Sequence, residues 1–144
     1  MRILVLSLPL ILFCQLGASA QSDKTRLQDL AYLMGQSLVV PGIAEYCDQF
    51  VAKNPELVRA GIRWNERHAK VLEAIEREFK RLSSDEKRRL NIPPYKELLK
   101  EIESRSDKIG YCKEIVQTIN SGDLDFGKRA DPAAALSRLG ISTK

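Results

Sequence analysis

Histidine, tryptophan and cysteine are scarce in this chain of 144 residues, which limits the chemistry available to it. His68 is the only histidine, Trp64 is the only tryptophan, and three cysteines occur. One histidine and so few cysteines do not make an ordinary zinc site. The chain also lacks the G-x-S-x-G, H-E-x-x-H and glycine-rich phosphate-binding motifs. We therefore expect no metal, no cofactor and no catalytic residues, and hence no enzyme.

Long apolar runs are absent after the first twenty residues. Arg2, the apolar run 3–13 and the small residues Ala18 and Ala20 together predict a secretory signal peptide, cleaved before Gln21. A membrane anchor is the alternative, but the run is shorter than the roughly 20 residues that a bilayer requires. A lipid anchor on Cys14 is a further alternative, although that cysteine lacks the usual small residue before it. We expect a periplasmic or secreted protein without a membrane span after cleavage.

Charge of one sign is not in large excess either. Cleavage of residues 1–20 leaves residues 21–144 as a single domain, and the loss of Arg2 lowers the formal net charge from +4 to +3. That value is ordinary for a soluble protein and is far below the basic excess of a nucleic-acid binder. Together with the exported location, it argues against nucleic acid as a partner.

Cleavage also removes Cys14 and leaves Cys47 and Cys112. An even pair of cysteines in an exported chain predicts a disulfide, with two buried thiols as the alternative. No C-x-x-C pair is present, so we expect the bond to be structural.

Segments of alternating apolar and polar residues are missing, so we expect no strand, and helical spacing dominates instead. The clearest helix spans residues 54–83, where Asn54 and Pro55 provide a start signal. Nine residues of this segment fall within one sector roughly 100° wide. They are Leu57, Gly61, Trp64, His68, Val71, Leu72, Ile75, Phe79 and Leu82.

The fold class predicted is all-α, a small disulfide-stapled helical bundle with about four main helices. Pro41 and Gly42 should end the first helix, and Pro93 and Pro94 should separate the last long one. Residues 124–130 are expected to be a loop, and the sequence leaves open whether the C-terminal part 121–144 packs on the domain. The main helices expected are 23–38, 43–53, 54–83 and 94–119, with short helices at 83–90 and 131–139.

Basic residues lie beside the apolar sector of the long helix, within an arc of about 80°. One interpretation is a binding surface for an anion or an acidic partner, built around Trp64. The other, commoner one is a solvated helix face whose arginine stems cover the edge of the core. Likewise, His68 is more often a hydrogen-bonded core residue than a catalytic base. The candidate residues are Arg59, Arg63, Trp64, Arg67 and Lys70, and the stripe continues through Arg77 and Arg81.

The runs Y-C-D-Q-F at 46–50, N-P-E-L at 54–57 and I-R-W-N-E-R-H at 62–68 resemble a pattern found in small exported helical proteins of bacteria. The resemblance covers about residues 46–82. It implies a location in the cell envelope, and it brings no activity, ligand or catalytic residue with it.

Three functions are compatible with these features. The first is a non-enzymatic interaction module that binds a protein partner of the cell envelope, with an anionic partner as one option. The second is a small-ligand or lipid carrier with a pocket near Trp64 and His68. The third is an enzyme that uses His68 with a carboxylate. We favour the first, because the helices are amphipathic and no catalytic constellation is visible.

Overall fold

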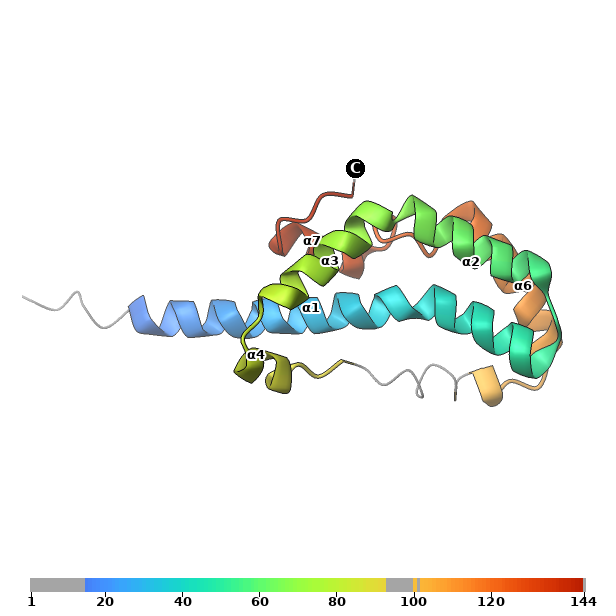
Figure 1. Ribbon diagram of the computed structural model, residues 1–144, viewed down its shortest axis with the longest axis horizontal. Helices are drawn as coiled ribbons and strands as arrows, with labels where there is room; N and C mark the ends of the chain where they lie inside the picture. Colours follow the sequence, from blue (N-terminus) through green and yellow to red (C-terminus); the bar gives the residue numbers. More distant parts are fainter. Residues whose placement is uncertain (1–14, 93–99, 101, 144) are drawn as a thin grey trace, which may run out of the picture.

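The computed structural model describes residues 15–92, 100 and 102–143, with side chains from Asp23 onward. These residues form helices and connecting turns without a strand, which confirms the all-α prediction. Figure 1 shows the long first helix with two helices arched over one side of it and a short helix on the other side. The elements are α1 (Gln15–Tyr46), the π-helix η1 (Cys47–Val51), α2 (Pro55–Arg67), α3 (Ala69–Arg81), α4 (Ser84–Arg89), α6 (Lys108–Ser121) and α7 (Ala130–Arg138).

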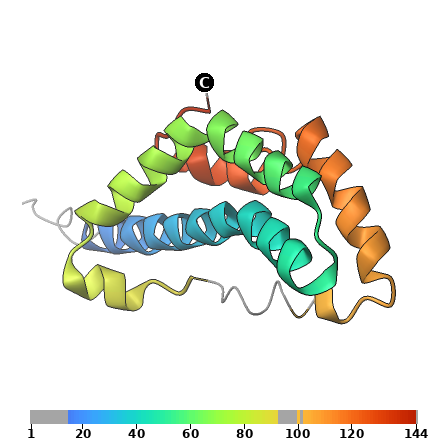
Figure 2. The same cartoon turned by 45° about the vertical axis from the view of Figure 1, so that its right-hand side comes forward.

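Helix α1 continues through Pro41, so the predicted end of the first helix at Pro41 and Gly42 is wrong. A proline inside a helix removes one backbone hydrogen bond and costs about 3 kcal/mol. Here the residues on both sides of it, Val40 and Ile43, are buried in the core, so packing holds the helix together across the proline. The helix bends near its C-terminal end, as Figure 2 shows. The predicted signal cleavage position falls within this helix, while residues 1–14 lie outside the described part.

The predicted second helix, 43–53, is the end of α1 and the single turn η1. In η1 the backbone N–H of Ala52 donates to the carbonyl of Cys47 at 3.0 Å, five residues back. This wider turn shifts the side-chain register. Cys47 is fully buried, whereas Phe50, three residues further on, is 71% exposed. The ring of Phe50 lies instead against Tyr46, with centroids 5.5 Å apart.

The predicted long helix divides at His68, whose backbone leaves the helical region (φ −104°, ψ 8°). Its start is as predicted, because the Asn54 side chain accepts a hydrogen bond from the Leu57 N–H at 3.2 Å. The apolar sector is continuous across the break and faces the core through Leu57, Trp64, Val71, Ile75 and Leu82. Figure 2 shows α2 and α3 as an arch over α1. The predicted short helix at 83–90 is α4, which begins with a capping box formed by Ser83 and Glu86.

Helices α1 and α2 cross closely at Gly61. A Cβ atom at this position would lie 3.2 Å from the Cβ of Ala44, tighter than nearly all such contacts. The glycine on the apolar face of α2 therefore allows the close approach of α1.

Helix α6 is joined to η1 by the predicted disulfide between Cys47 and Cys112, with Cα atoms 5.8 Å apart. The helix begins at Lys108, and the side chain of Asp107 accepts from the Gly110 N–H at 2.7 Å. Residues 105–107 are not helical, so a single helix over 94–119 is wrong. The expected start of that helix at Pro94 lies outside the described residues. Gly122 ends α6 in the left-handed region (φ 79°), as predicted.

The C-terminal helix α7 packs on α1, which answers the question that the sequence left open. The Arg138 guanidinium donates two hydrogen bonds of 2.7 Å to the buried carboxylate of Asp29. Arg129 donates to the side-chain oxygen of Gln36 at 2.6 Å. Helix α7 is therefore attached to α1 by these polar contacts.

Candidate functional site

Three aromatic rings meet where the break between α2 and α3 faces the loop between α6 and α7. Trp64 is 1% exposed, and its ring centroid lies 4.6 Å from His68 and 5.4 Å from Phe126. The rings of His68 and Phe126 meet edge to face at 5.2 Å. The indole N–H of Trp64 donates to the Leu124 carbonyl at 3.4 Å. Trp64 is thus a core residue whose polar edge fixes the loop.

His68 points from the helix break towards Asp125. Its Nε2 atom lies 3.0 Å from a carboxylate oxygen of Asp125, but the N–H direction does not align as a hydrogen bond requires. We regard the contact as a close electrostatic approach inside the core, since distance and orientation disagree. The buried position of His68 agrees with its interpretation as a core residue.

Arg67 ties the same carboxylate to the end of α6. Its Nη2 atom donates to the Ile119 carbonyl at 2.8 Å and to Asp125 at 3.0 Å. Cations near the C-terminus of a helix are favoured by the helix dipole. Burial alone would raise the pKa of Asp125, but the close approach of His68 and the hydrogen bond from Arg67 outweigh it, so the pKa lies below its usual value.

Asp125→Asn is expected to lower the free energy of unfolding by about 1–2 kcal/mol at neutral pH, because it removes a charged acceptor from Arg67. A lowered folded-state pKa means that the carboxylate stabilises the fold above its ordinary value of 3.8 and loses that effect as pH falls through the folded value. Urea unfolding followed from pH 7 to pH 2 should therefore show a smaller acid-dependent loss in the variant. Asp123→Asn, in an exposed position of the same loop, is the control. Identical acid dependence in both variants would contradict this role.

Arg59 and Arg63 share one carboxylate at the start of α2. Arg63 donates to Glu56 at 2.8 Å and to the side-chain oxygen of Asn120 at 3.1 Å, while Arg59 donates to Glu56 at 3.1 Å. Hydrogen bonds from Arg63 and then Arg59 lower the pKa of Glu56. Two cations against one anion leave this part of α2 with a positive surplus.

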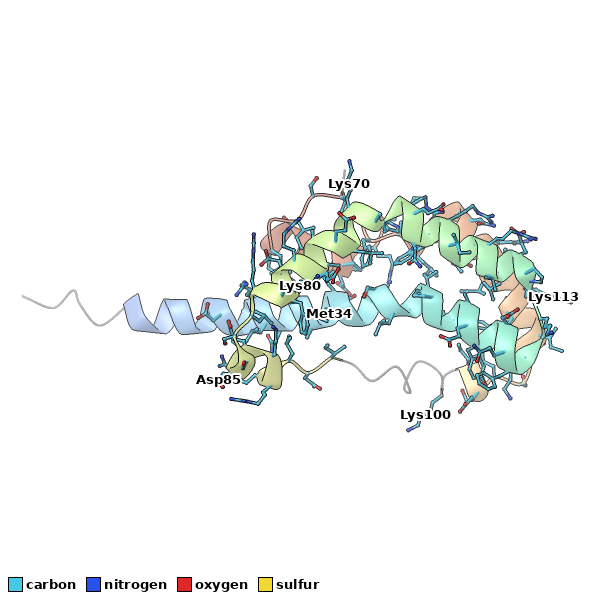
Figure 3. All side chains as sticks on the ribbon, viewed as in Figure 1. Met34, Lys70, Lys80, Asp85, Lys100 and Lys113 are labelled. Atoms are coloured by element: carbon cyan, nitrogen blue, oxygen red, sulfur yellow. A yellow bond between two sulfur atoms is a disulfide. The ribbon has the colours of Figure 1, made fainter. Side chains whose placement is uncertain are left out.

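The structure therefore does not present the basic stripe as one continuous array. Arg63 and Arg67 lie against α6 and its following loop, and only Arg59 and Arg63 are linked, through Glu56. Lys70 follows the helix break at His68 and points away from the bundle, as Figure 3 shows. Trp64 lies beneath this surface rather than on it.

Sequence reasoning did not assign Asp125 and Phe126 to this region. Residues 124–130 form turns as predicted, but Phe126 is 2% exposed. The available signal was the presence of large apolar residues, Leu124 and Phe126, within an otherwise polar loop. Such residues indicate a loop that packs on the core.

A separate pocket of 750 Å³ lies between the first half of α1 and α4. It is distant in sequence from Trp64, beside which the alternative ligand pocket was expected and where the Phe126 ring now packs. The pocket is lined by Asp23, Lys24, Leu27, Gln28, Ala31, Tyr32, Glu86, Arg89 and Asn91.

No family model, curated protein or solved structure matches this chain. Within the described part, no group of three or more His, Cys, Asp or Glu residues is placed to hold a metal ion. The same residues include no helix that is long and apolar enough to cross a membrane.

Proposed function

We propose that this protein is an exported, non-enzymatic binding module that recognises a protein partner through the outer face of α2. The observation that carries the proposal is an apolar pair on that face. Val58 and Ile62, one helical turn apart, are 37% and 52% exposed. Single exposed apolar residues are normal, but here two lie together with Arg59 between them in sequence.

The chemistry of this face favours an acidic partner surface. Interface centres are enriched in apolar residues and arginine relative to other surfaces. Arg59 and Arg63 share Glu56 alone among the described acidic residues, so one positive charge remains for a carboxylate of the partner. The partner is thus expected to present apolar side chains with at least one Asp or Glu beside them.

Two features support export to the periplasm or beyond. One is the apolar N-terminal run with its small residues before Gln21, and the other is the Cys47–Cys112 disulfide, which oxidising compartments favour. The partner is therefore sought in the cell envelope.

A photoreactive amino acid placed at Ile62 should form a specific adduct with one envelope protein, whereas the same group at Lys113 should not. Lys113 lies on a different helix, α6, and is also exposed to solvent (Figure 3). Adding Arg59→Glu to the chain labelled at Ile62 should reduce the adduct at least tenfold, and raising the salt concentration should no longer weaken the adduct.

Thermal unfolding of each protein provides the control for folding, since Arg59 and Ile62 lie outside the core. Equal adducts from both positions, or an adduct that survives Arg59→Glu unchanged, would contradict recognition through this face.

A further inference from the structure

The pocket between α1 and α4 has an apolar part and a charged part. Leu27, Ala31 and Tyr32 lie on one side of α1 at helical spacing, with Ala31 5% exposed and the other two half-buried. Lys24 lies one turn before Leu27, and Arg89 faces the same space from the end of α4. Apolar linings with a few polar groups are typical of small-ligand sites.

The wall formed by α4 is held in place on the side away from the arch of α2 and α3 (Figure 1, Figure 2). Arg26 of α1 contacts Glu78 of α3 at 3.2 Å and Glu86 of α4 at 3.8 Å. Glu86 also accepts from the Ser83 N–H at 2.8 Å in the capping box. The pocket is therefore a built feature of the fold, because three helices meet at Arg26.

The charged groups of the lining, taken together with their ion-pair partners Arg26, Arg81 and Glu78, sum to one positive charge, and Arg89 also acts electrostatically on Glu86. Arg26 and Arg81 balance Glu78 and Glu86, with which they form ion pairs. Among the described residues, no ion pair involves the three other charged groups of the lining. These are two cations, Lys24 and Arg89, and one anion, Asp23.

We propose that this pocket binds a free fatty acid, an amphipathic monoanion with a single acyl chain. The carboxylate lies between Lys24 and Arg89, and the chain lies along Leu27, Ala31 and Tyr32. Residues 23–32 span about 14 Å of helix axis, which matches an extended chain of about ten carbons. The volume of 750 Å³ is within the range of single-ligand sites. The proposal is independent of partner recognition through α2, which uses other residues.

Calorimetric titration of the disulfide-bonded chain with decanoate, below its aggregation concentration, tests the site. We expect saturable binding of one decanoate per chain, and at least tenfold weaker binding of decanol and of the decyltrimethylammonium cation. Arg89→Glu should weaken decanoate binding at least tenfold, and Gln28→Trp should abolish it by filling the pocket. The matched controls are Arg77→Glu on α3 and Gln117→Trp on α6, both exposed and outside the lining, which should bind like the parent chain.

Three results would overturn the proposal. Equal binding of decanoate and decanol would show that Lys24 and Arg89 do not recognise a carboxylate. Undiminished binding by Gln28→Trp would show that decanoate does not bind in this pocket. Binding only to vesicles of anionic phospholipid, without saturable binding of decanoate, would show that the protein recognises a membrane surface and not a free fatty acid. Circular dichroism of each variant shows whether the fold is intact, and Gln28, being exposed, is not part of the core.

Discussion

Trp64→Ala is expected to lower the free energy of unfolding by about 3–5 kcal/mol, the usual cost of truncating a large buried aromatic residue. The side chain is 1% exposed and packs against the rings of both His68 and Phe126. Its removal opens a cavity at the place where α2, α3 and the loop after α6 meet. It also leaves the Leu124 carbonyl without its indole donor.

Urea unfolding of the parent and variant chains measures this loss. Ile62→Ala is the matched control, because Ile62 lies on the same helix but is 52% exposed, and it should change the stability by well under about 1 kcal/mol. If both variants lose the same stability, the cluster around Trp64 is not a centre of the core. Phe126→Ala should resemble Trp64→Ala, since the two rings fill one space.

The buried faces could be predicted from the sequence, but the ends of the helices could not. The spacing of Leu57, Trp64, Val71 and Ile75 identified the core face of α2 and α3 because period 3.6 survives the break at His68. The break itself depends on the contacts of His68 with distant residues. At Pro41 the sequence predicts the end of a helix, because the residue before a proline avoids the helical region. Helix α1 nevertheless continues through Pro41, since tertiary packing overrides this local preference.

The contacts of the basic residues on α2 could likewise be predicted only where they are local in sequence. The pair of Arg59 and Glu56 is local and follows from helical spacing. The contacts that decide the roles of the other arginines are long-range, joining Arg63 to Asn120 and Arg67 to Asp125. Periodicity carries no information about which loop packs against a given helix. The sequence therefore allowed the whole stripe to be interpreted as solvent-exposed, whereas two of its arginines bind α6 and the loop after it.

Cys47→Ser is expected to lower the free energy of unfolding by roughly 4 kcal/mol relative to the disulfide-bonded chain, through the larger freedom of the unfolded state. The bond joins residues 65 positions apart and connects η1 to α6. Both half-cystines are buried, at 0% and 2% exposure, so a reductant reaches the sulfur atoms only when the protein opens. The folded protein should therefore resist dithiothreitol and lose the bond rapidly in urea.

Urea unfolding in the presence and absence of reductant measures the effect. The reduced parent chain should match Cys47→Ser within about 1 kcal/mol, and Cys47→Ala serves to separate loss of the bond from burial of a hydroxyl group. Adding reductant to either variant should change nothing, because each has already lost the bond. Labelling of both sulfurs in the unfolded, unreduced parent would show that the bond is absent, and the stability of the junction between η1 and α6 would then rest on packing and on the contact of Asn54 with the Cys112 carbonyl at 3.5 Å.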